Sequence, residues 1–540
     1  MRAILLSVLV GLAWAAPPQF VFTTGSCPVE PGGDTHRVAI VGGGPSGASA
    51  AYFFGAAQTQ LATNPACPKR TLDVTLFERS RVGGRVEAIY PLDDPGLERV
   101  EIGAGLVYDV DETLIRAISS FGLRWSSDQT RLAKHVGVWN GKEFVIENDG
   151  STWSQTKLLW RYGRSPANVL KLLGEAVKSF SRVYSPQFLH ERPVRGGDNR
   201  LPAPYSGYPW SSAAELAHAV LPGGLVNQSA NEYYAQQGIS ELFTNEMASA
   251  TTRVNFAHNI DQINAFAGLY AFKSSESRHV RNGNHLLFER MVNESGAAVR
   301  VGASGTVTGI MKTSEGWWVG TADGHGSTFD SVVVATPWSL SGIALLNTDK
   351  MIHMVSYRPV HVTLVATTES RPKASFFGQA RSDSDMPQTI LTAPSISAAN
   401  ATQTPLISLS YVRELSPQQH RKQLGTLYIV RVLSHRALDD TTLTDMFGTV
   451  VWTHRKEWDA FPDMSRDAKR RSFEIDTGLY HVSVIEPLIS TMEASVISAK
   501  NVAALILQRW LGDGFVNGRH CRWSARNPNT DWSGWGCNSS

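Results

Sequence analysis

The residues with the clearest chemistry are three glycines between a short apolar stretch and a helix-forming stretch. Gly42, Gly44 and Gly47 have the G-x-G-x-x-G spacing. This pattern follows a buried strand, here expected at residues 38–41, and opens a helix, here expected at residues 45–54. Gly42 permits a tight turn, Gly44 lets the main chain approach a diphosphate, and Gly47 lets the helix pack closely on the strand. Because the first N–H groups of a helix favour an anion, the spacing predicts a dinucleotide site.

An acidic residue ends the next expected strand, at residues 73–77. The carboxylate of Glu78 can accept hydrogen bonds from a ribose diol, as the acid of a dinucleotide-binding unit does. Glu78 follows Gly47 by 31 residues (78 minus 47), where about 20 is usual. We assign the excess to an inserted loop at residues 56–70, which contains two prolines.

A second glycine-rich segment follows Glu78. Gly83 and Gly84 allow another close approach of the main chain to a diphosphate, and Arg85 can offer charge-assisted hydrogen bonds to phosphate. A surface turn with a solvated arginine is the alternative. With the glycines at residues 101–105, this order of motifs resembles FAD-dependent, amine-oxidase-like flavoproteins. The resemblance implies FAD as the cofactor, with Gly84 and Arg85 among the residues that bind it.

Length and composition narrow the class of protein. The chain has 540 residues, a formal net charge of +2 and 15 tryptophans. A nearly balanced charge gives no indication of a nucleic-acid partner, and this length favours roughly two to four domains. The spacing of the four cysteines matches neither a zinc site nor a redox C-x-x-C, so we expect no metal.

The N-terminal residues are typical of a secretory protein. Residues 1–15 combine an arginine, a short apolar stretch and an Ala-x-Ala cleavage pattern, which indicates a signal peptide. No later stretch is apolar enough to predict a transmembrane helix. We therefore expect a secreted protein or one of the vacuolar or lysosomal lumen. Glycosylation signals agree with this route and lie at Asn227, Asn293, Asn400 and Asn538.

Disulfides are expected in such a compartment. Four cysteines can pair in three ways. Short loops favour the pairs Cys27–Cys67 and Cys521–Cys537, because short loops close easily.

The chain is expected to be an α/β protein in which one domain is interrupted twice. We assign the glycine motifs and apolar strands to a Rossmann-type FAD-binding domain of the amine-oxidase-like kind, and the insertions to an interleaved α+β substrate domain. The FAD-binding segments are 36–125, 284–346 and 470–512, the substrate segments are 126–283 and 347–469, and a tail rich in Trp, Gly and Cys occupies 513–540.

Periodicity predicts helices in the first insertion and strands elsewhere. The expected helices are 153–162, 167–183, 212–220, 229–248 and 260–275. The expected strands are 298–310, 316–321 and 330–337, the last ending in a turn, in the FAD-binding segments, and 360–366, 406–411 and 428–433 in the second insertion.

Five further blocks, in order along the chain, resemble the prenylcysteine oxidase (prenylcysteine lyase) family. They lie within 243–266, 282–284, 330–337, 458–462 and 479–510, so the resemblance covers roughly residues 36–510. The chain departs from the family pattern at Asn282, Pro487 and Leu488, where smaller residues are usual. We expect the last two near the flavin, where they bear on the substrate.

The resemblance implies further cofactor-binding residues. Ser490 and Thr491 offer an N-cap for a helix expected over Met492–Leu511, whose N-terminal amides would face the flavin pyrimidine. Glu486 would hold the ribitol hydroxyls. Val307 is a candidate for main-chain contact with the adenine. Plain core packing is the alternative for Val307 and for the helix.

The activity that the resemblance implies is oxidative cleavage of a prenyl thioether. The carbon between sulfur and the allylic double bond loses a hydride to FAD, and water then adds. The products are an aldehyde, cysteine and, after reoxidation by molecular oxygen, hydrogen peroxide. His258 and His481 could act as a base toward water, with a structural role as the alternative for each. Glu246 and Arg253 are expected as a buried ion pair, with a substrate clamp as the alternative.

Two other functions stay open at this point. The same scaffold would serve a flavin oxidase of amines or of another small metabolite. A non-catalytic lipid-binding glycoprotein could also keep the fold. Trp458, Phe461 and Tyr480 suit a prenyl pocket and equally an aromatic core. A visible spectrum followed by turnover of farnesylcysteine separates the three functions.

Overall fold

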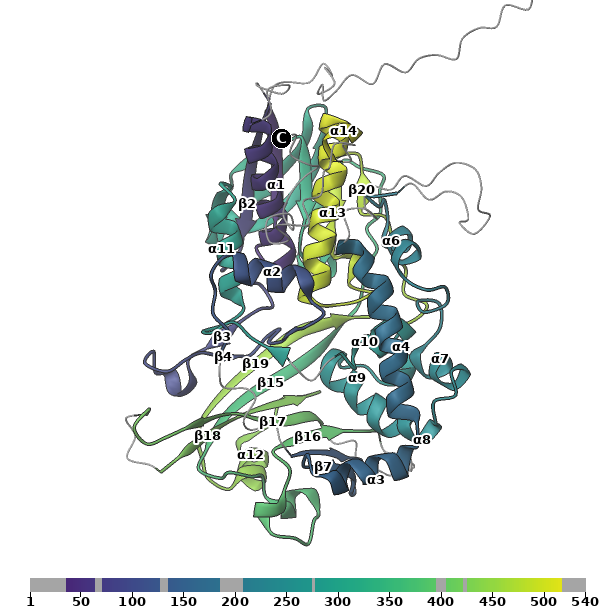
Figure 1. Ribbon diagram of the computed structural model, residues 1–540. Helices are drawn as coiled ribbons and strands as arrows, with labels where there is room; N and C mark the ends of the chain where they lie inside the picture. Colours follow the sequence, from purple (N-terminus) through teal and green to yellow (C-terminus); the bar gives the residue numbers. More distant parts are fainter. Residues whose placement is uncertain are drawn as a thin grey trace, which may run out of the picture.

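The computed structural model of the chain describes residues 35–63, 70–126, 135–184, 207–273, 277–394, 405–420 and 425–516. The expected signal peptide, all four cysteines, Asn400, Asn538 and the tail beyond residue 516 lie outside these residues. Figure 1 shows the described chain as two halves, each built on a sheet. No helix among the described residues is long and apolar enough to cross a membrane.

Six strands form the first sheet: β1 Thr35–Val41, β2 Thr71–Glu78, β9 Ala298–Val301, β13 Ser331–Val334, β20 Glu474–Asp476 and β21 Leu479–His481. The order is β20-β21-β13-β1-β2-β9, and all neighbours are parallel except β20 and β21. Val38 and Ile40 belong to a core on one face of the sheet, whereas Ala39 and Val41 belong to a core on the other. Burial on both faces explains the continuous apolar run.

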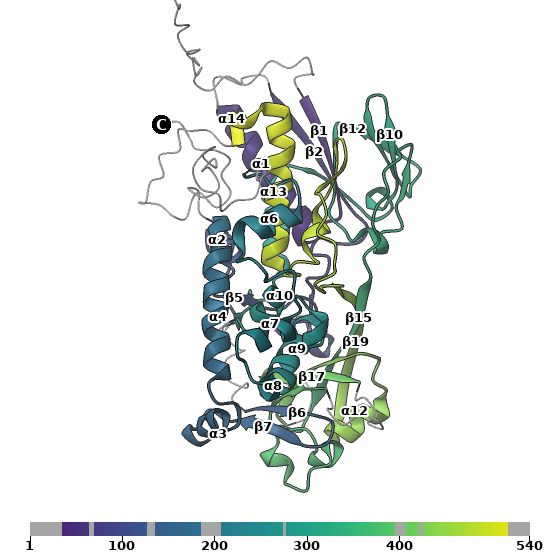
Figure 2. The same cartoon turned by 90° about the vertical axis from the view of Figure 1, so that its right-hand side faces the viewer.

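The two faces are covered differently. Three helices cover one face: α1 Pro45–Thr63, α11 His285–Glu294 and α13 Met492–Leu511. Of these, α1 and α13 lie side by side in both views (Figures 1 and 2). A four-stranded sheet covers the other face, in the order β12-β11-β10-β14. Its strands are β10 Val307–Thr313, β11 Gly316–Thr321, β12 Gly326–Phe329 and β14 Ala344–Leu346.

A seven-stranded sheet forms the other half of the molecule (Figure 1). Its strands are β6 Val136–Trp139, β7 Phe144–Asn148, β15 Tyr357–Thr367, β16 Thr389–Thr392, β17 Leu406–Leu415, β18 Leu427–Ser434 and β19 Val450–Pro462. The order is β19-β15-β18-β17-β16-β6-β7. The strands predicted at 360–366, 406–411 and 428–433 are confirmed as parts of β15, β17 and β18.

Most of the remaining helices pack beside this second sheet, and short elements complete the chain. The helices are α3 Thr152–Tyr162, α4 Ser165–Phe180, α6 Ala213–Val220, α7 Ala230–Gln236, α8 Glu241–Phe243, a π-helical turn Thr244–Ala248, α9 Ser249–Phe256, α10 Ala265–Tyr270 and α12 Asp440–Phe447. Of these, α6 lies in the other half near β20 (Figure 1). The short elements are α2 Glu112–Ser120, α14 Asp513–Val516 and the strand pairs β3 Ala88–Ile89 with β4 Val100–Glu101 and β5 Val107–Tyr108 with β8 Ser277–Arg278.

The helix predicted over Met492–Leu511 is confirmed, with the Thr491 side chain as its N-cap. The end predicted for α1 is wrong. It does not give way to a loop at 56–70 but continues to Thr63. Its last turns are rich in alanine and glutamine, which favour a helix. Ala57 and Leu61, four residues apart, are both fully buried and hold this extension against the core.

The helices expected at 229–248 and 260–275 are each broken. Gly238 has a positive φ two residues after the end of α7 and stops that helix, and the chain resumes as α8. In the second segment a 3-10 turn and α10 replace the long helix. The strand expected at 298–310 is also divided, because a 3-10 turn at Gly302–Gly305 sends β9 and β10 into different sheets.

A buried amide joins α13 to the segment before α6. The Asn501 Oδ1 accepts a hydrogen bond from the Trp210 main-chain N–H at 2.8 Å, and its Nδ2 donates to the Trp210 carbonyl at 2.8 Å. The Asn501 side chain is fully buried, so water cannot replace either bond. This contact fixes the long helix against a segment nearly 300 residues away in sequence.

We expect Asn501→Ala to lower the free energy of unfolding by about 3 kcal/mol, because two buried hydrogen bonds are lost together. Urea unfolding followed by circular dichroism measures this loss. Asn168→Ala, on the exposed face of α4, is the matched control and should change stability by no more than about 0.5 kcal/mol. Equal losses in the two variants would contradict the role given to Asn501.

Candidate functional site

A cavity of about 840 Å³ lies where the two halves meet. One wall contains the residues that follow the carboxyl ends of β1, β2 and β13, and the other contains residues of β15, β18 and β19. Parallel sheets bind ligands at the carboxyl ends of their strands. The volume falls within the roughly 300–1,000 Å³ of ligand pockets. This cavity is therefore the candidate site.

The glycine motifs pack main chain against main chain at this cavity. A Cβ atom on Gly47 would lie 1.8 Å from the Gly42 carbonyl oxygen, so only glycine fits there. A Cβ atom on Gly84 would lie 2.9 Å from the Gly44 Cα. The Gly83 N–H donates to the Gly43 carbonyl at 2.9 Å, which ties the two glycine segments together. Gly42, Gly44 and Gly84 therefore line the cavity with main chain and without side chains.

Two helices begin at this cavity. Pro45 opens α1, and the cavity is lined by Pro45 and Ser46 from that helix and by Met492 and Ser495 from α13. The Thr491 Oγ1 accepts a hydrogen bond from the Ala494 N–H at 3.1 Å and so caps α13. A helix N-terminus carries a partial positive charge and unpaired N–H groups. The two starts together suit a ligand with separated negative groups, such as a dinucleotide.

Glu78 lies at the end of β2 with its carboxylate at the cavity. One carboxylate oxygen accepts from the Gly43 N–H at 2.7 Å and the other from the Ser80 N–H at 2.8 Å. These bonds hold the buried carboxylate in one position. The oxygen bound by the Ser80 N–H also accepts from the Ser80 hydroxyl at 3.3 Å, so the oxygen bound by Gly43 is the one that keeps a lone pair for a further donor. The arrangement fits the hydroxyl groups of a ribose.

Arg85 and Glu486 form an ion pair at the cavity wall, in which Glu486 is buried and the Arg85 side chain is 32% exposed. The Arg85 guanidinium donates to Glu486 at 2.7 Å and to the Ala460 carbonyl at 2.9 Å. The Tyr357 hydroxyl donates to the second Glu486 oxygen at 3.0 Å. Burial and the neighbouring Glu486 carboxylate raise the pKa of Tyr357. The structure thus brings together two residues that the sequence assigned to separate parts of the ligand.

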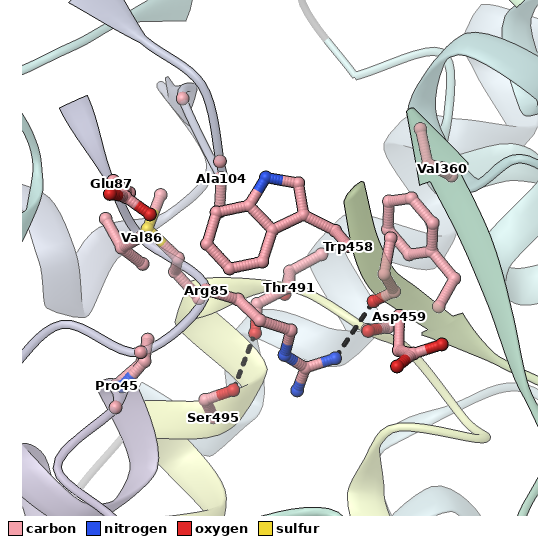
Figure 3. Close-up of a pocket in the computed structure, with 18 of the residues that line it drawn as sticks. Pro45, Arg85, Val86, Glu87, Ala104, Val360, Trp458, Asp459, Thr491 and Ser495 are labelled. Atoms are coloured by element: carbon pink, nitrogen blue, oxygen red, sulfur yellow. Dashed lines mark hydrogen bonds between the residues drawn. The ribbon is translucent and has the colours of Figure 1, made fainter. Parts of the chain in front are cut away.

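The sheet side of the cavity is mainly apolar. Val360, Val362 and Leu433 line it, together with the rings of Phe256 and Phe461. Trp458 reaches in from β19, and its Nε1 donates to the Ile102 carbonyl at 2.8 Å. Figure 3 shows the Trp458 indole near Ala104, with Arg85 and Thr491 beyond it. This wall suits an apolar ligand segment.

Arg431 and Lys273 both line the cavity, and neither has an ion pair among the described residues. Arg431 projects from β18 and has no side-chain hydrogen bond in the described chain. The Lys273 Nζ lies 3.8 Å from the Tyr108 ring centroid and 4.3 Å from that of Tyr270. Burial lowers the pKa of Lys273 to about 8, so the amine is charged at lower pH. Asp111 also lines this region and has both oxygens occupied by Tyr108 and Tyr270.

Glu101 lies behind the Arg431 end of the cavity. One oxygen accepts from the Asn284 N–H at 2.6 Å, and the other has no partner among the described residues. Burial raises the pKa of Glu101 to about 8, and Arg431 opposes this rise only in part. The carboxyl group is therefore largely protonated below that pH.

The histidines predicted as bases do not line this cavity. His258 is fully buried, and its Nδ1 bonds the Phe256 carbonyl at 2.5 Å. Burial lowers the pKa of His258 to about 4. The His481 Nε2 bonds the Thr336 carbonyl at 3.1 Å and lines a separate cavity of about 420 Å³. Neither ring faces a ligand in the larger cavity, and the catalytic role of each stays a prediction.

Other predicted residues are also placed away from the cavity. Val307 begins β10 and packs in the core between the two sheets of its half. Tyr480 is buried, and its hydroxyl accepts from Arg509. Leu488 is fully buried, and the carbonyls of Pro487 and Leu488 accept from the amide of Asn264. The departures from the family pattern at 487 and 488 therefore lie at a packed turn behind the site.

The expected ion pair between Glu246 and Arg253 is wrong. Glu246 accepts two hydrogen bonds from Arg161, at 2.8 and 2.6 Å, and one from the Tyr162 hydroxyl at 2.7 Å. Arg253 instead donates to Asn259. A π-helical turn over Thr244–Ala248 changes the rotation per residue, so a spacing of seven no longer places the two residues on one face.

Sequence reasoning missed Arg431 and Lys273. A signal for Arg431 exists in the pattern of β18. Leu427, Ile429, Arg431 and Leu433 alternate with the residues of the other face. A charged side chain on the same face of a strand as buried apolar residues needs an oppositely charged partner or must face a cavity. No comparable local pattern marks Lys273, which follows the end of α10.

Comparisons with known proteins agree with this geometry. A family model described as prenylcysteine lyase matches residues 145–515. Prenylcysteine oxidase 1 of Homo sapiens is 27% identical over 505 residues, which cover 88% of this chain and 90% of that protein. The farnesylcysteine lyase of Arabidopsis thaliana is 24% identical over 491 residues and covers 88% of each.

Two solved structures have a similar fold. The CLA-producing fatty acid isomerase from P. acnes has a TM-score of 0.55 at 13% identity. The cyclohexylamine oxidase from Brevibacterium oxydans IH-35A has a TM-score of 0.50 at 11% identity. Each match covers 88% of this chain and 99% of the other. These likenesses confirm the predicted α/β fold of the amine-oxidase-like kind.

We expect the stability penalty of Glu101 to grow with pH. Its folded-state pKa of about 8 lies above the ordinary value. Below about pH 4 the group is protonated in both the folded and the unfolded state, so its ionisation does not change the free energy of unfolding. Between that pH and about pH 8 the free energy of unfolding falls by up to about 1.4 kcal/mol per pH unit. Glu101→Gln keeps a neutral side chain throughout. In urea unfolding, the free energy of unfolding of Glu101→Gln should exceed that of the wild type by an amount that grows from about pH 5 to about pH 8.

The matched control is Glu143→Gln in the exposed turn between β6 and β7. Its difference from the wild type should stay small across the same range, because an exposed side chain keeps its solvation. A constant difference between Glu101→Gln and the wild type across this range would show that Glu101 is not protonated in the folded protein.

Proposed function

The chain belongs to the prenylcysteine lyase family, and on that premise we propose that it is an FAD-dependent oxidase that cleaves the thioether of a prenylated cysteine. The observation that carries the proposal is the composition of the cavity of about 840 Å³ between the two halves. It joins a main-chain cradle for a dinucleotide to an apolar wall that ends in two cations. An amino acid with a long apolar substituent matches this cavity, because its charged end suits the cations and its apolar chain suits the apolar wall.

The residues that would hold FAD are those at the glycine end of the cavity. The main chain at Gly42, Gly44 and Gly84 would receive the diphosphate, which needs close approach and N–H donors. The Glu78 carboxylate would accept the ribose hydroxyls. The first N–H groups of α13, at Met492, would face an electron-rich edge of the flavin ring. FAD, when bound, supplies the two-electron acceptor that no side chain can provide.

Overall, the prenyl thioether reacts with one water and one molecular oxygen. The bond between sulfur and the prenyl carbon breaks, and that carbon becomes an aldehyde. Cysteine leaves with a free thiol, and hydrogen peroxide carries away the two electrons and two protons. The chain's contribution is to position the substrate and to exclude bulk water. Val360, Val362 and Leu433 would contact the prenyl chain, since they form the apolar wall.

Arg431 would bind the carboxylate of the substrate. Its guanidinium lines the cavity in the same strand as Leu433 and has no anionic hydrogen-bond partner in the described chain. Lys273 adds positive charge on the same side. A carboxylate would pair with Arg431 through charge-assisted hydrogen bonds, which are among the stronger polar contacts in proteins. The amino-acid end and the prenyl end would thereby point in fixed directions along the cavity.

We also propose the secretory route inferred from residues 1–15 for this enzyme. The glycosylation signals at Asn227 and Asn293 support it: Asn227 lies in a turn between α6 and α7, and Asn293 lies near the end of α11. Peptide-N-glycosidase treatment of protein from a eukaryotic host tests this route, with a mobility shift as the expected result.

We expect purified protein to be yellow and to release cysteine, an aldehyde and hydrogen peroxide from farnesylcysteine. Gly47→Ala should abolish the chromophore, because its Cβ would overlap the Gly42 carbonyl. Gly174→Ala in α4 is the control, since nothing lies within 4 Å of that position. A colourless wild type would favour the lipid-binding glycoprotein, and a yellow protein that oxidises amines but not farnesylcysteine would favour the amine oxidase.

We expect Arg431→Gln to raise the KM for farnesylcysteine by about 10- to 100-fold with little change in kcat, because a charge-assisted hydrogen bond to a charged group contributes about 1.5–3 kcal/mol. Arg431→Lys keeps the charge and should show a smaller rise. Steady-state peroxide assays give both constants. An unchanged KM in Arg431→Gln, with the wild type active, would place the carboxylate elsewhere and leave the oxidase activity intact.

A further inference from the structure

Helix α3 presents tryptophan and lysine side chains to solvent. The Trp160 side chain is 93% exposed and that of Trp153 is 67% exposed, although tryptophan is usually well buried. The Lys157 Nζ lies 5.5 Å from the Trp153 ring centroid. Because these residues are spaced by four and then three, they share one face of the helix.

The opposite side of α3 is anchored in the protein. Tyr162 is buried, donates to Glu246 at 2.7 Å, and packs edge-on against the Phe243 ring. Arg161 forms an ion pair with Glu246 at 2.6 Å. Leu158 packs against the main core. The helix that carries the two exposed tryptophans is therefore held in place by contacts on its other side.

The charged side chains of residues 152–174 are all basic. Residues 152–174 contain no aspartate or glutamate. Their four cations are Lys157, Arg161, Arg164 and Lys171. Arg161 is paired with Glu246, and the other three are exposed with no ion-pair partner among the described residues. Leu159 in α3 and Leu170 in α4 are also exposed. The acid that precedes the helix in sequence is Asp149.

We propose that this surface, called the α3 face and made of Trp153, Lys157 and Trp160, docks the protein on an anionic phospholipid membrane. Tryptophan is enriched at membrane interfaces, where its ring meets the acyl boundary and its N–H meets water. Lysine and arginine are drawn to anionic headgroups. A helix with an apolar and basic face lies in the plane of such an interface.

A second copy of this chain is a poorer occupant. A two-fold dimer would place the same patch on both sides of the contact and bring three unpaired cations against their equals. Figures 1 and 2 show α3 at one end of the molecule, far from α14 at the other. Docking would thus bring the end of the seven-stranded sheet to the lipid. The proposal does not use the cavity and holds whether or not the proposed activity is correct.

Vesicle flotation of the full-length secreted protein tests the proposal. The probes are phosphatidylcholine vesicles with and without phosphatidylserine. We expect the wild type to float with the mixed vesicles and to bind pure phosphatidylcholine more weakly. Trp153→Ser combined with Trp160→Ser should lower binding about tenfold or more, since both interfacial rings are lost. Lys157→Gln combined with Lys171→Gln should weaken binding at low salt and little at high salt.

The matched control is Met351→Ser combined with Met354→Ser, which removes two exposed apolar side chains outside α3. It should bind as the wild type does, and circular dichroism melting should show that every variant is folded. Failure of the wild type to float overturns the proposal, as does equal binding by the tryptophan variant. Sedimentation velocity gives a third outcome: a wild-type dimer that the tryptophan variant abolishes would make the α3 face a contact between copies.

Discussion

The close approach of two main-chain segments at Gly44 and Gly84 is the constraint on which the site depends. A side chain at position 84 would move the other segment, because the Gly84 Cβ would lie 2.9 Å from the Gly44 Cα, whereas a Cβ on Gly44 would lie 3.7 Å from the Gly84 Cα, an ordinary contact. The contact lets the N-terminus of α1 and the second glycine segment border one space. The α13 N-terminus reaches the same space only because α13 packs along α1. Main-chain packing therefore sets the positions of all the N–H donors that could face a diphosphate.

Charge is buried in two different ways at opposite walls of the cavity. At one wall Arg85, Glu486 and Tyr357 satisfy one another, so the cost of removing the charges from water is offset within the protein. At the other, Arg431 lines the cavity without an anion, and the neighbouring Glu101 is largely protonated instead of forming an ion pair. Perturbed groups of this kind concentrate at functional sites. The first wall is complete as it stands, whereas the second lacks a partner that an anionic ligand can supply.

Local patterns predicted the parts of the fold that are decided locally. The G-x-G-x-x-G turn and the start of α13 follow from glycines and an N-cap threonine within a few residues. The end of α1 differs from the expected one because the alanines and glutamines before Pro65 favour a helix and carry it to Thr63. The direction in which Glu246 points could not be predicted, because a π-helical turn has no clear sequence signal. His258 and His481 were chosen by residue type, and only the tertiary structure shows that both rings bond main-chain carbonyls away from the large cavity.

The cationic end of the cavity shows why strand pairing is needed to find a site. Arg431 in β18 and Val362 in β15 are brought to one surface by the pairing of those two strands, in which Val362 is opposite Leu433. A shift of one residue would turn Arg431 to the other face of the sheet. The apolar wall and the cation are thus set by one register, so the distance between them is a property of the sheet. The cavity then selects a ligand by the distance between its charged group and its apolar chain. Two paired strands hold that distance more rigidly than a loop would.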